Sequence, residues 1–182
     1  GIAFALAGLL AHKGRFAEAQ ELVDGLSVGE EDAVAMADAK ATLAGLAGDT
    51  LLGQITMDEL VSRRPNNGAV LNNDCWFRGR FAVGLDDALD LCTRAVERSE
   101  FAAPSLDSRA LVRFRLGQTA EALADLDAAL ALSPGLSPSI YLRGVIRLTT
   151  GDQRGREDIA TALAMSPQIA DYYAHYGIRP PG

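Results

Sequence analysis

The sequence predicts an all-α protein: a superhelical stack of about five helix pairs, closed by a short C-terminal helix. Three observations lead to this fold class. Apolar residues recur at three- and four-residue steps, as on one face of a helix, in segments such as 121–132. Leucine and alanine, which favour helices, are abundant, and alternating strand-like runs are missing. Glycine and proline separate the helical segments at regular intervals.

The spacing of the glycines indicates an internal repeat. Gly14 and Gly48 are 34 residues apart, and so are Gly117 and Gly151. From Gly48 to Gly117 the interval is 69, which is two periods plus one, so a repeat without the glycine lies between them. A period of this length, with a glycine in the middle of each unit, is typical of stacked helix–turn–helix repeats.

The helices expected from this pattern follow one another in pairs. Their expected bounds are 2–12, 16–27, 31–47, 50–63, 69–82, 85–99, 105–116, 119–131, 138–149 and 153–164. The corresponding repeats, within a single domain over 1–182, are 1–31, 32–66, 67–103, 104–135 and 136–168. The final stretch, 169–178, is amphipathic and carries three tyrosines. We expect it to cap the last repeat, because an open end would expose an apolar face.

Composition and charge exclude several classes of function. With 48% hydrophobic and 23% charged residues the chain is globular in character, and no apolar run is long enough to span a membrane. A net charge of −7 disfavours nucleic acid and anionic membrane surfaces as partners. No catalytic, cofactor or metal motif is present, so we expect neither an enzyme nor a bound cofactor. Because the chain begins at Gly1 within a helical pattern, we expect it to be part of a longer protein.

The repeats resemble the tetratricopeptide repeat family. In that family one small residue on the first helix and two on the second let the paired helices approach closely. Ala110, Ala122 and Ala129 fill these places in the fourth repeat, with Gly117 at the turn. Gly144 takes the first place in the fifth repeat, and Cys75 takes it in the third. The resemblance implies a right-handed superhelix with a concave groove that binds a protein or peptide.

Arginines recur on successive first helices and allow two interpretations. They could form a ladder that grips a carboxylate or phosphate. Alternatively, as the resemblance implies, they pair with acids on the second helix, Arg109 with Asp125 and Arg143 with Asp158. We favour internal pairing, since a partly desolvated guanidinium needs such a partner. Three further arginines could serve either purpose: Arg78, Arg113 and Arg147.

The first helices should also line the concave groove, since they form the inner surface of a tetratricopeptide superhelix. Aromatic and arginine side chains there would suit a bound peptide. The alternative is that Trp76 and Phe114 pack against the next repeat, and that Asn72 bonds locally at the start of its helix. The candidate groove residues are Asn72, Trp76, Arg80, Asp107, Leu111, Phe114, Arg115, Tyr141, Val145 and Leu148.

The two cysteines lie on the two helices of the third repeat, at positions that face each other. A disulfide between Cys75 and Cys92 is therefore possible. We favour two buried thiols that act as small apolar side chains.

These observations predict a protein-interaction module that binds a peptide or a partner helix in its groove. A second hypothesis comes from a further resemblance. Three stretches, 71–77, 106–117 and the closing 169–178, resemble the C-terminal repeat region of bacterial exported proteins with a transglutaminase-like core. That would make the chain a non-catalytic appendage in the periplasm with an intramolecular partner, whereas otherwise we expect a cytoplasmic protein. Self-association is a third alternative.

Overall fold

The structure is a computed structural model that describes residues 2–26, 29 and 32–182. Over these residues it contains eleven α-helices and no strand, which confirms the all-α fold class. The helices are α1 (Ile2–His12), α2 (Phe16–Asp24), α3 (Ala33–Leu46), α4 (Thr50–Arg63), α5 (Gly68–Phe81), α6 (Leu85–Arg98), α7 (Ala103–Arg115), α8 (Thr119–Leu132), α9 (Ser137–Thr149), α10 (Gly155–Met165) and α11 (Ile169–Ala174).

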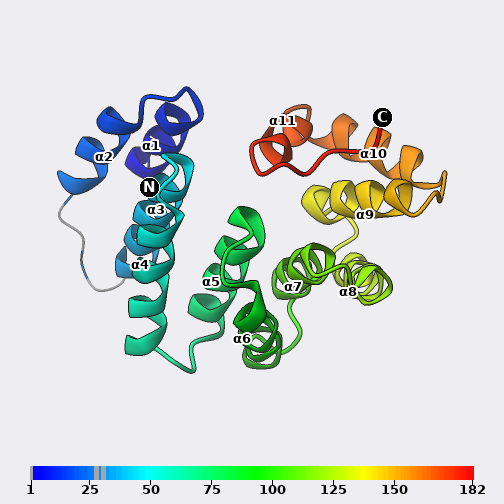
Figure 1. Ribbon diagram of the computed structural model, residues 1–182, viewed down its shortest axis with the longest axis horizontal. Coiled ribbons are helices and arrows are strands. Elements are labelled where there is room, and N and C mark those ends of the chain that lie inside the picture. Colours follow the sequence, from blue (N-terminus) through cyan, green and yellow to red (C-terminus); the bar gives the residue numbers. More distant parts are fainter. Residues whose placement is uncertain (1, 27–28, 30–31) are drawn as a thin grey trace.

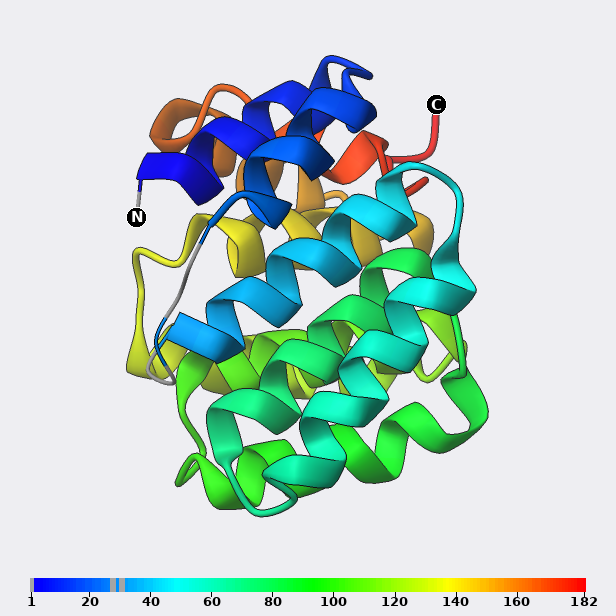
Figure 2. The same ribbon diagram turned by 90° about the vertical axis from the view of Figure 1, so that its left-hand side faces the viewer.

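Consecutive helices pack in five pairs, from α1 with α2 to α9 with α10. Figure 1 shows these pairs following one another along an arc, with α3, α5, α7 and α9 on its inner side and α6, α8 and α10 on its outer side. In Figures 1 and 2 the first and last helices come to lie at the same end of the molecule. The inner side of the arc is therefore a concave surface flanked by both ends of the chain.

The turn inside each pair uses a residue in the left-handed backbone region. Gly14, Gly48, Gly117 and Gly151 have φ between 74° and 94°, a region that favours glycine. The third pair, which has no glycine at this place, uses Ala82 at φ 54° instead. The regular glycine spacing in the sequence therefore reports a repeated turn geometry.

Small residues occupy the seams between paired helices, as the sequence predicts. Ala110, Ala122 and Ala129 are fully buried in the fourth pair. In the fifth pair, a Cβ added at Gly144 would lie 2.9 Å from the carbonyl oxygen of Gly155, and one added at Gly155 would lie 2.5 Å from that of Gly144. Such distances leave no room for a side chain, so the two glycines permit the close crossing of α9 and α10.

The third pair is joined by a disulfide between Cys75 of α5 and Cys92 of α6. The expectation of two free thiols is therefore wrong. Both cysteines occupy small positions at the seam, and the approach of the helices brings their Cα atoms to 5.1 Å, within the range that a disulfide spans. The close packing that suits two small apolar side chains also suits a covalent bond.

Helix ends differ from the expected bounds where proline and glycine act locally. α7 begins at Ala103, two residues earlier than expected, because Pro104 fits the first turn of a helix. The closing helix ends at Ala174, and Gly177, at φ 69°, follows it in the left-handed region. The expected end of the second helix and start of the third, at 27 and 31, lie outside the described residues.

Candidate functional site

The C-terminal segment, residues 169–178, packs into the concave side of the arc. Tyr173 stacks on Tyr141 of α9 with ring centroids 5.0 Å apart, and its edge meets Trp76 of α5 at 6.4 Å. Its hydroxyl donates to the carbonyl oxygen of Pro138 at 3.3 Å. The segment therefore contacts the last pair, as a cap does, and also reaches the third pair (Figure 1).

Tyr176 ties the segment to the middle of the arc. Its hydroxyl accepts a hydrogen bond from Arg80 of α5, and its backbone carbonyl accepts one from Arg115 of α7. Its ring meets Phe81 edge to face at 5.3 Å. Ile178 follows it into the core with 1% of its surface exposed.

The structure brings most of the candidate groove residues together, but the C-terminal segment packs over them. Trp76, Leu111 and Phe114 contribute to the same apolar cluster as Tyr173 and Tyr176. Five of the ten candidates are buried: Arg80, Asp107, Leu111, Tyr141 and Val145. The other five are half-buried: Asn72, Trp76, Phe114, Arg115 and Leu148. The sequence shows the tyrosines of the segment but not the side of the arc on which they pack.

Arg80 is the most unusual of these residues, because its charge is surrounded by aromatic rings. Its guanidinium carbon lies 5.5 to 5.6 Å from the ring centroids of Trp76, Phe81 and Tyr176, a cation–π arrangement. Its Nη2 donates to Thr42 Oγ1 at 3.0 Å. Its Nε is buried and has no hydrogen-bond partner among the residues that the structure describes.

The carboxylate that faces Arg80 is Asp38 of α3, with 4.0 Å between Arg80 Nη2 and Asp38 Oδ1. This is the outer limit of an ion pair, so the attraction is weak compared with a direct hydrogen-bonded contact. Burial raises the pKa of Asp38, and the charge of Arg80 opposes that rise only in part. The two partners therefore differ in burial: the Arg80 side chain is 6% exposed, whereas the Asp38 side chain is 38% exposed.

A pocket of about 340 Å³ opens beside Arg80, between the first two helix pairs and α5. Its lining is mostly small and apolar, with Asp38, Thr42 and Arg80 as its polar residues; the remaining members are Ala7, Gly8, Ala11, Ala35, Ala39, Leu43 and Leu46. A second cavity, between α1 and the C-terminal segment, shares Gly8 with it. The concave side is thus still open next to the N-terminal pairs.

Asp107 is a second buried charge of the concave side. It lies on α7 and accepts a hydrogen bond from the Ser139 hydroxyl. Burial raises the pKa of Asp107 to about 6, and the hydrogen bond from Ser139 offsets only part of this effect. Burial, with the nearby carboxylate of Asp107, also raises the pKa of Tyr173 well above its usual value. Both groups are covered, so they belong to the packing of the segment and do not face a ligand.

The recurring arginines pair with acids of the chain. In the fourth pair Arg109 makes two hydrogen bonds to Asp125, at 2.9 and 2.7 Å, which confirms the predicted partner. Arg113, whose role the sequence left open, lies 2.7 Å from the same carboxylate. In the third pair Arg78 contacts Asp74 and Asp58.

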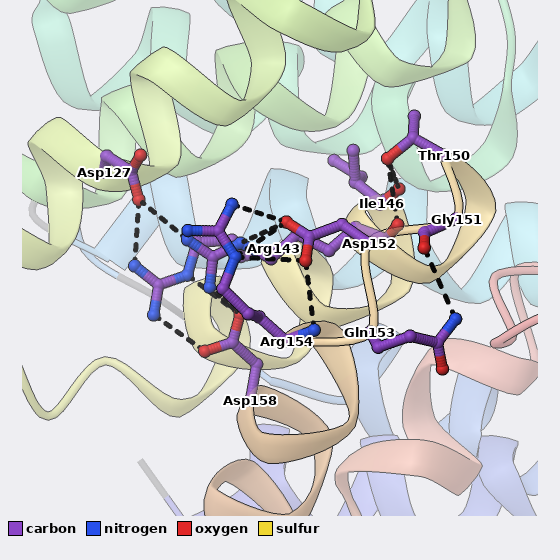
Figure 3. Close-up of polar contacts among 10 residues, drawn as sticks. Asp127, Arg143, Ile146, Thr150, Gly151, Asp152, Gln153, Arg154 and Asp158 are labelled. Carbon is purple, nitrogen blue, oxygen red and sulfur yellow. Dashed lines mark hydrogen bonds and ion pairs between the residues drawn. The ribbon is translucent and has the colours of Figure 1, made fainter.

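The fifth pair repeats this arrangement, and Figure 3 shows it in detail. Arg143 binds Asp158 through two hydrogen bonds of 3.0 and 2.8 Å, again as predicted, and Arg147 binds the same carboxylate at 2.7 Å. Asp127 of α8 reaches Arg143 from the neighbouring pair at 2.9 Å. Because each of these arginines contacts a carboxylate of the chain, we infer that they stabilise the stack of helices.

Two further properties bear on function. Within the described part of the chain, no group of three or more His, Cys, Asp or Glu residues could hold a metal ion. No helix among the described residues is long and apolar enough to cross a bilayer.

Comparisons with solved structures support the fold described above. No family model and no curated protein matches the chain. Solved structures do match, among them a thermophilic tetratricopeptide repeat protein of Thermus thermophilus, TTC0263, with a TM-score of 0.72 and 22% identity over 96% of both chains. This chain has the tetratricopeptide repeat fold.

Two other matches of this fold come from different bacterial proteins. The type IV pilus biogenesis factor PilW gives a TM-score of 0.68 at 14% identity, over 96% of this chain and 84% of PilW. MamA of Desulfovibrio magneticus gives 0.60 at 13% identity, over 92% and 94%. At these identities the matches establish the tetratricopeptide fold alone. None of them supports the second resemblance, to the repeat region of transglutaminase-like proteins.

Proposed function

We propose that this chain is a non-catalytic protein-interaction module that binds a peptide or a partner helix on its concave side. The observation that carries the proposal is the curved stack of helix pairs, whose inner side is built from first helices and remains open beside α1 and α3. Such a surface offers many side chains in a fixed geometry to one extended partner. The proposal assigns no catalytic role to any residue.

The position of the C-terminal segment restricts where a partner can bind. Tyr173 is fully buried, and Ile169, Tyr176 and Ile178 are each at most 7% exposed. Displacing the segment would expose these four side chains, at a cost of roughly 1.5–3 kcal/mol for each large apolar residue. We therefore place the partner next to the segment, on the side of α1 and α3, and not in its place.

Affinity capture from an extract of the source organism tests this function. The baits are the wild-type chain and Gly8→Leu, which fills the opening between α1 and the C-terminal segment, where a Cβ at this position meets no atom within 4 Å. Ala128→Leu, on the exposed side of α8, is the control. Reductant is omitted, because the Cys75–Cys92 disulfide would be reduced.

We expect the same protein to be retained by the wild type and by Ala128→Leu and to be lost with Gly8→Leu. Equal retention by all three baits would place the interaction outside the concave side. If no bait retains a protein above the level of an unrelated helical protein, the proposed function is wrong.

A further inference from the structure

Exposed apolar side chains gather on one face of α4. Among the described residues eight large apolar side chains are exposed, and three of them, Leu51, Leu52 and Ile55, lie in the first half of this helix. Each of the three is more than half exposed, and Ile55 follows Leu51 by one helical turn. Within the described part of the chain α4 packs against α3 and α5 and against no other helix. A contiguous apolar patch of this kind is typical of a surface that binds another molecule.

The patch leads into a pocket of about 590 Å³ between α3 and α4. Thr56 and Glu59 line this pocket, and they follow Leu52 and Ile55 by one turn on the same side of α4. Its apolar lining includes Met36 of α3. A partner that packs on the patch can therefore place a further apolar side chain in the pocket.

This pocket is separate from the concave one, because the two lie on opposite faces of α3. Met36 and Lys40 line the pocket beside α4, whereas Asp38 and Thr42 line the pocket beside Arg80. Residues two positions apart on a helix point to nearly opposite sides. Figure 2 shows α3 and α4 side by side on the face of the molecule turned to the viewer. A partner can therefore bind this outer face whether or not the concave side is occupied.

The pocket lies where the preceding second helix packs in the fourth pair. There Val96, near the end of α6, packs against Leu106 and Ala129. The matching residues of the second pair, two repeats earlier, are Ala37 and Leu60, and both line the pocket. The preceding second helix here is α2, which has nine residues, whereas α6 has 14. No described residue of α2 is part of the lining, so this end of the seam stays accessible.

The last turn of α4 makes the other end of this face cationic. Lys40, Arg63 and Arg64 line the pocket beside Glu59, in a chain whose net charge is −7. Lys40 pairs with Asp24, but the two side chains are 41% and 53% exposed. The pair of Arg63 with Glu59 is more exposed still. Because water screens such pairs and they contribute little, carboxylates of a partner can join or replace them at small cost.

The order of these features along α4 indicates what kind of molecule fits. A second copy of the same face matches poorly in a two-fold arrangement: antiparallel helices would put the cations of one α4 against the apolar half of the other, and parallel helices would put cations against cations. A partner helix with acids in its first turn and apolar residues after it matches both halves when it runs antiparallel to α4. Its acids then also lie where its own helix dipole favours negative charge.

We propose that the outer face of α3 and α4 is a second interaction surface, which binds an amphipathic partner helix with an acidic first turn. Leu51, Leu52 and Ile55 pack against the apolar side of that helix, and Lys40 and Arg63 bind its acids. The contact runs along the 14 residues of α4, a length of about 21 Å. This surface goes beyond the proposed function and does not depend on it.

The test is a titration of the folded chain with fluorescently labelled, capped peptides of the same length as α4, followed by fluorescence anisotropy. The first peptide carries glutamates in its first turn and leucines at three- and four-residue steps after it. The second carries glutamines in place of the glutamates. The third has the composition of the first, with the glutamates moved to the last turn. The second peptide tests the charge, and the third tests the direction of the helix.

We expect the first peptide to bind at least fivefold more tightly than either of the others. Ile55→Ser should weaken its binding at least tenfold, and Lys40→Gln with Arg63→Gln should reduce the preference for glutamate to less than twofold. Leu132→Ser is the matched control, because it removes a leucine that is 63% exposed on another helix, and it should bind as the wild type does. Gly8→Leu, on the concave side, should also bind as the wild type does. Circular dichroism checks that each variant is folded.

Three results would overturn this surface. The first is a lack of binding, or equal affinity for the first two peptides. The second is an Ile55→Ser variant that binds the first peptide as the wild type does. The third is a dimer in sedimentation velocity that Ile55→Ser dissociates, because a second copy would then occupy the face. None of these results touches the proposed function, which Gly8→Leu tests in the capture experiment.

Discussion

At the scale of single residues, the structure separates charges that hold the stack from charges on its surface. Asp158 is nearly buried and accepts hydrogen bonds from both Arg143 and Arg147. Asp127 contacts the same Arg143, but 56% of its side chain is exposed. Removing a buried partner leaves uncompensated charge behind, whereas an exposed ion pair contributes little because water and salt screen it.

This difference gives a paired prediction. Asp158→Ala should lower the free energy of unfolding by about 3–5 kcal/mol, because it leaves two arginines without their shared acid. Asp127→Ala should lower it by about 1 kcal/mol or less. Urea unfolding followed by circular dichroism measures both. Similar losses for the two variants would contradict the assignment of Asp158 as the central acid of the fifth pair.

Asp107 makes stability depend on pH. Its folded pKa of about 6 lies above the ordinary value of 3.8, so the folded state holds this proton more tightly than the unfolded state does. The resulting stability is greatest below pH 3.8 and is lost as the pH rises to about 6. Asp107→Asn removes this dependence while keeping an oxygen that accepts from Ser139.

We therefore expect the unfolding free energy of Asp107→Asn, relative to wild type, to improve by about 2 kcal/mol between pH 4 and pH 7. Urea denaturation at the two pH values gives this number directly. The comparison between variant and wild type cancels the titration of other carboxyl groups. A difference that stays constant with pH would show that Asp107 titrates normally.

At the scale of helices, the parts that could be predicted are those that depend on local geometry. The 34-residue spacing of glycines reports the left-handed turns, and the small residues Ala110 and Ala122 report the seam of a pair. The partners Asp125 and Asp158 could be predicted because they sit in the same pair as their arginines. The disulfide could not, since two small apolar positions and two bonded cysteines give the same pattern in a sequence.

The disulfide links α5 to α6 across a loop of 17 residues and should stabilise the third pair. Closing a loop of this length removes entropy from the unfolded chain that corresponds to about 3 kcal/mol. Cys75→Ala with Cys92→Ala should lower the free energy of unfolding by about this amount, and reductant should lower the melting temperature of the wild type but not of the double variant. A wild type that is insensitive to reductant would show that the thiols are not bonded.

At the scale of the whole molecule, the C-terminal segment changes what kind of repeat protein this is. In a simple stack each pair contacts only its neighbours, and stability is a sum of local terms. Here Tyr173 bridges α5 and α9, and Tyr176 bridges α5 and α7, so the third to fifth pairs share one apolar cluster. No local pattern predicts this arrangement, because it brings together residues about 100 positions apart in the chain. It also explains why half of the predicted groove residues are covered.

This bridging predicts that the helices joined by the C-terminal segment open together, whereas helices that it does not contact open independently. Tyr173→Ala removes a fully buried aromatic side chain and should cost about 3–5 kcal/mol, as large-to-small changes in cores do. Hydrogen exchange followed by mass spectrometry should then show faster exchange in α5 and α9 together, since Tyr173 is the side chain that bridges these two helices. α2 should be nearly unchanged, because within the described part of the chain it packs against α1 and α3 and against no other helix. Leu132→Ala, at a position that is 63% exposed, is the matched control and should leave all these helices unchanged. Faster exchange in α9 alone would mean that the segment is an ordinary cap of the last pair, and that the concave side is open to a partner along its whole length.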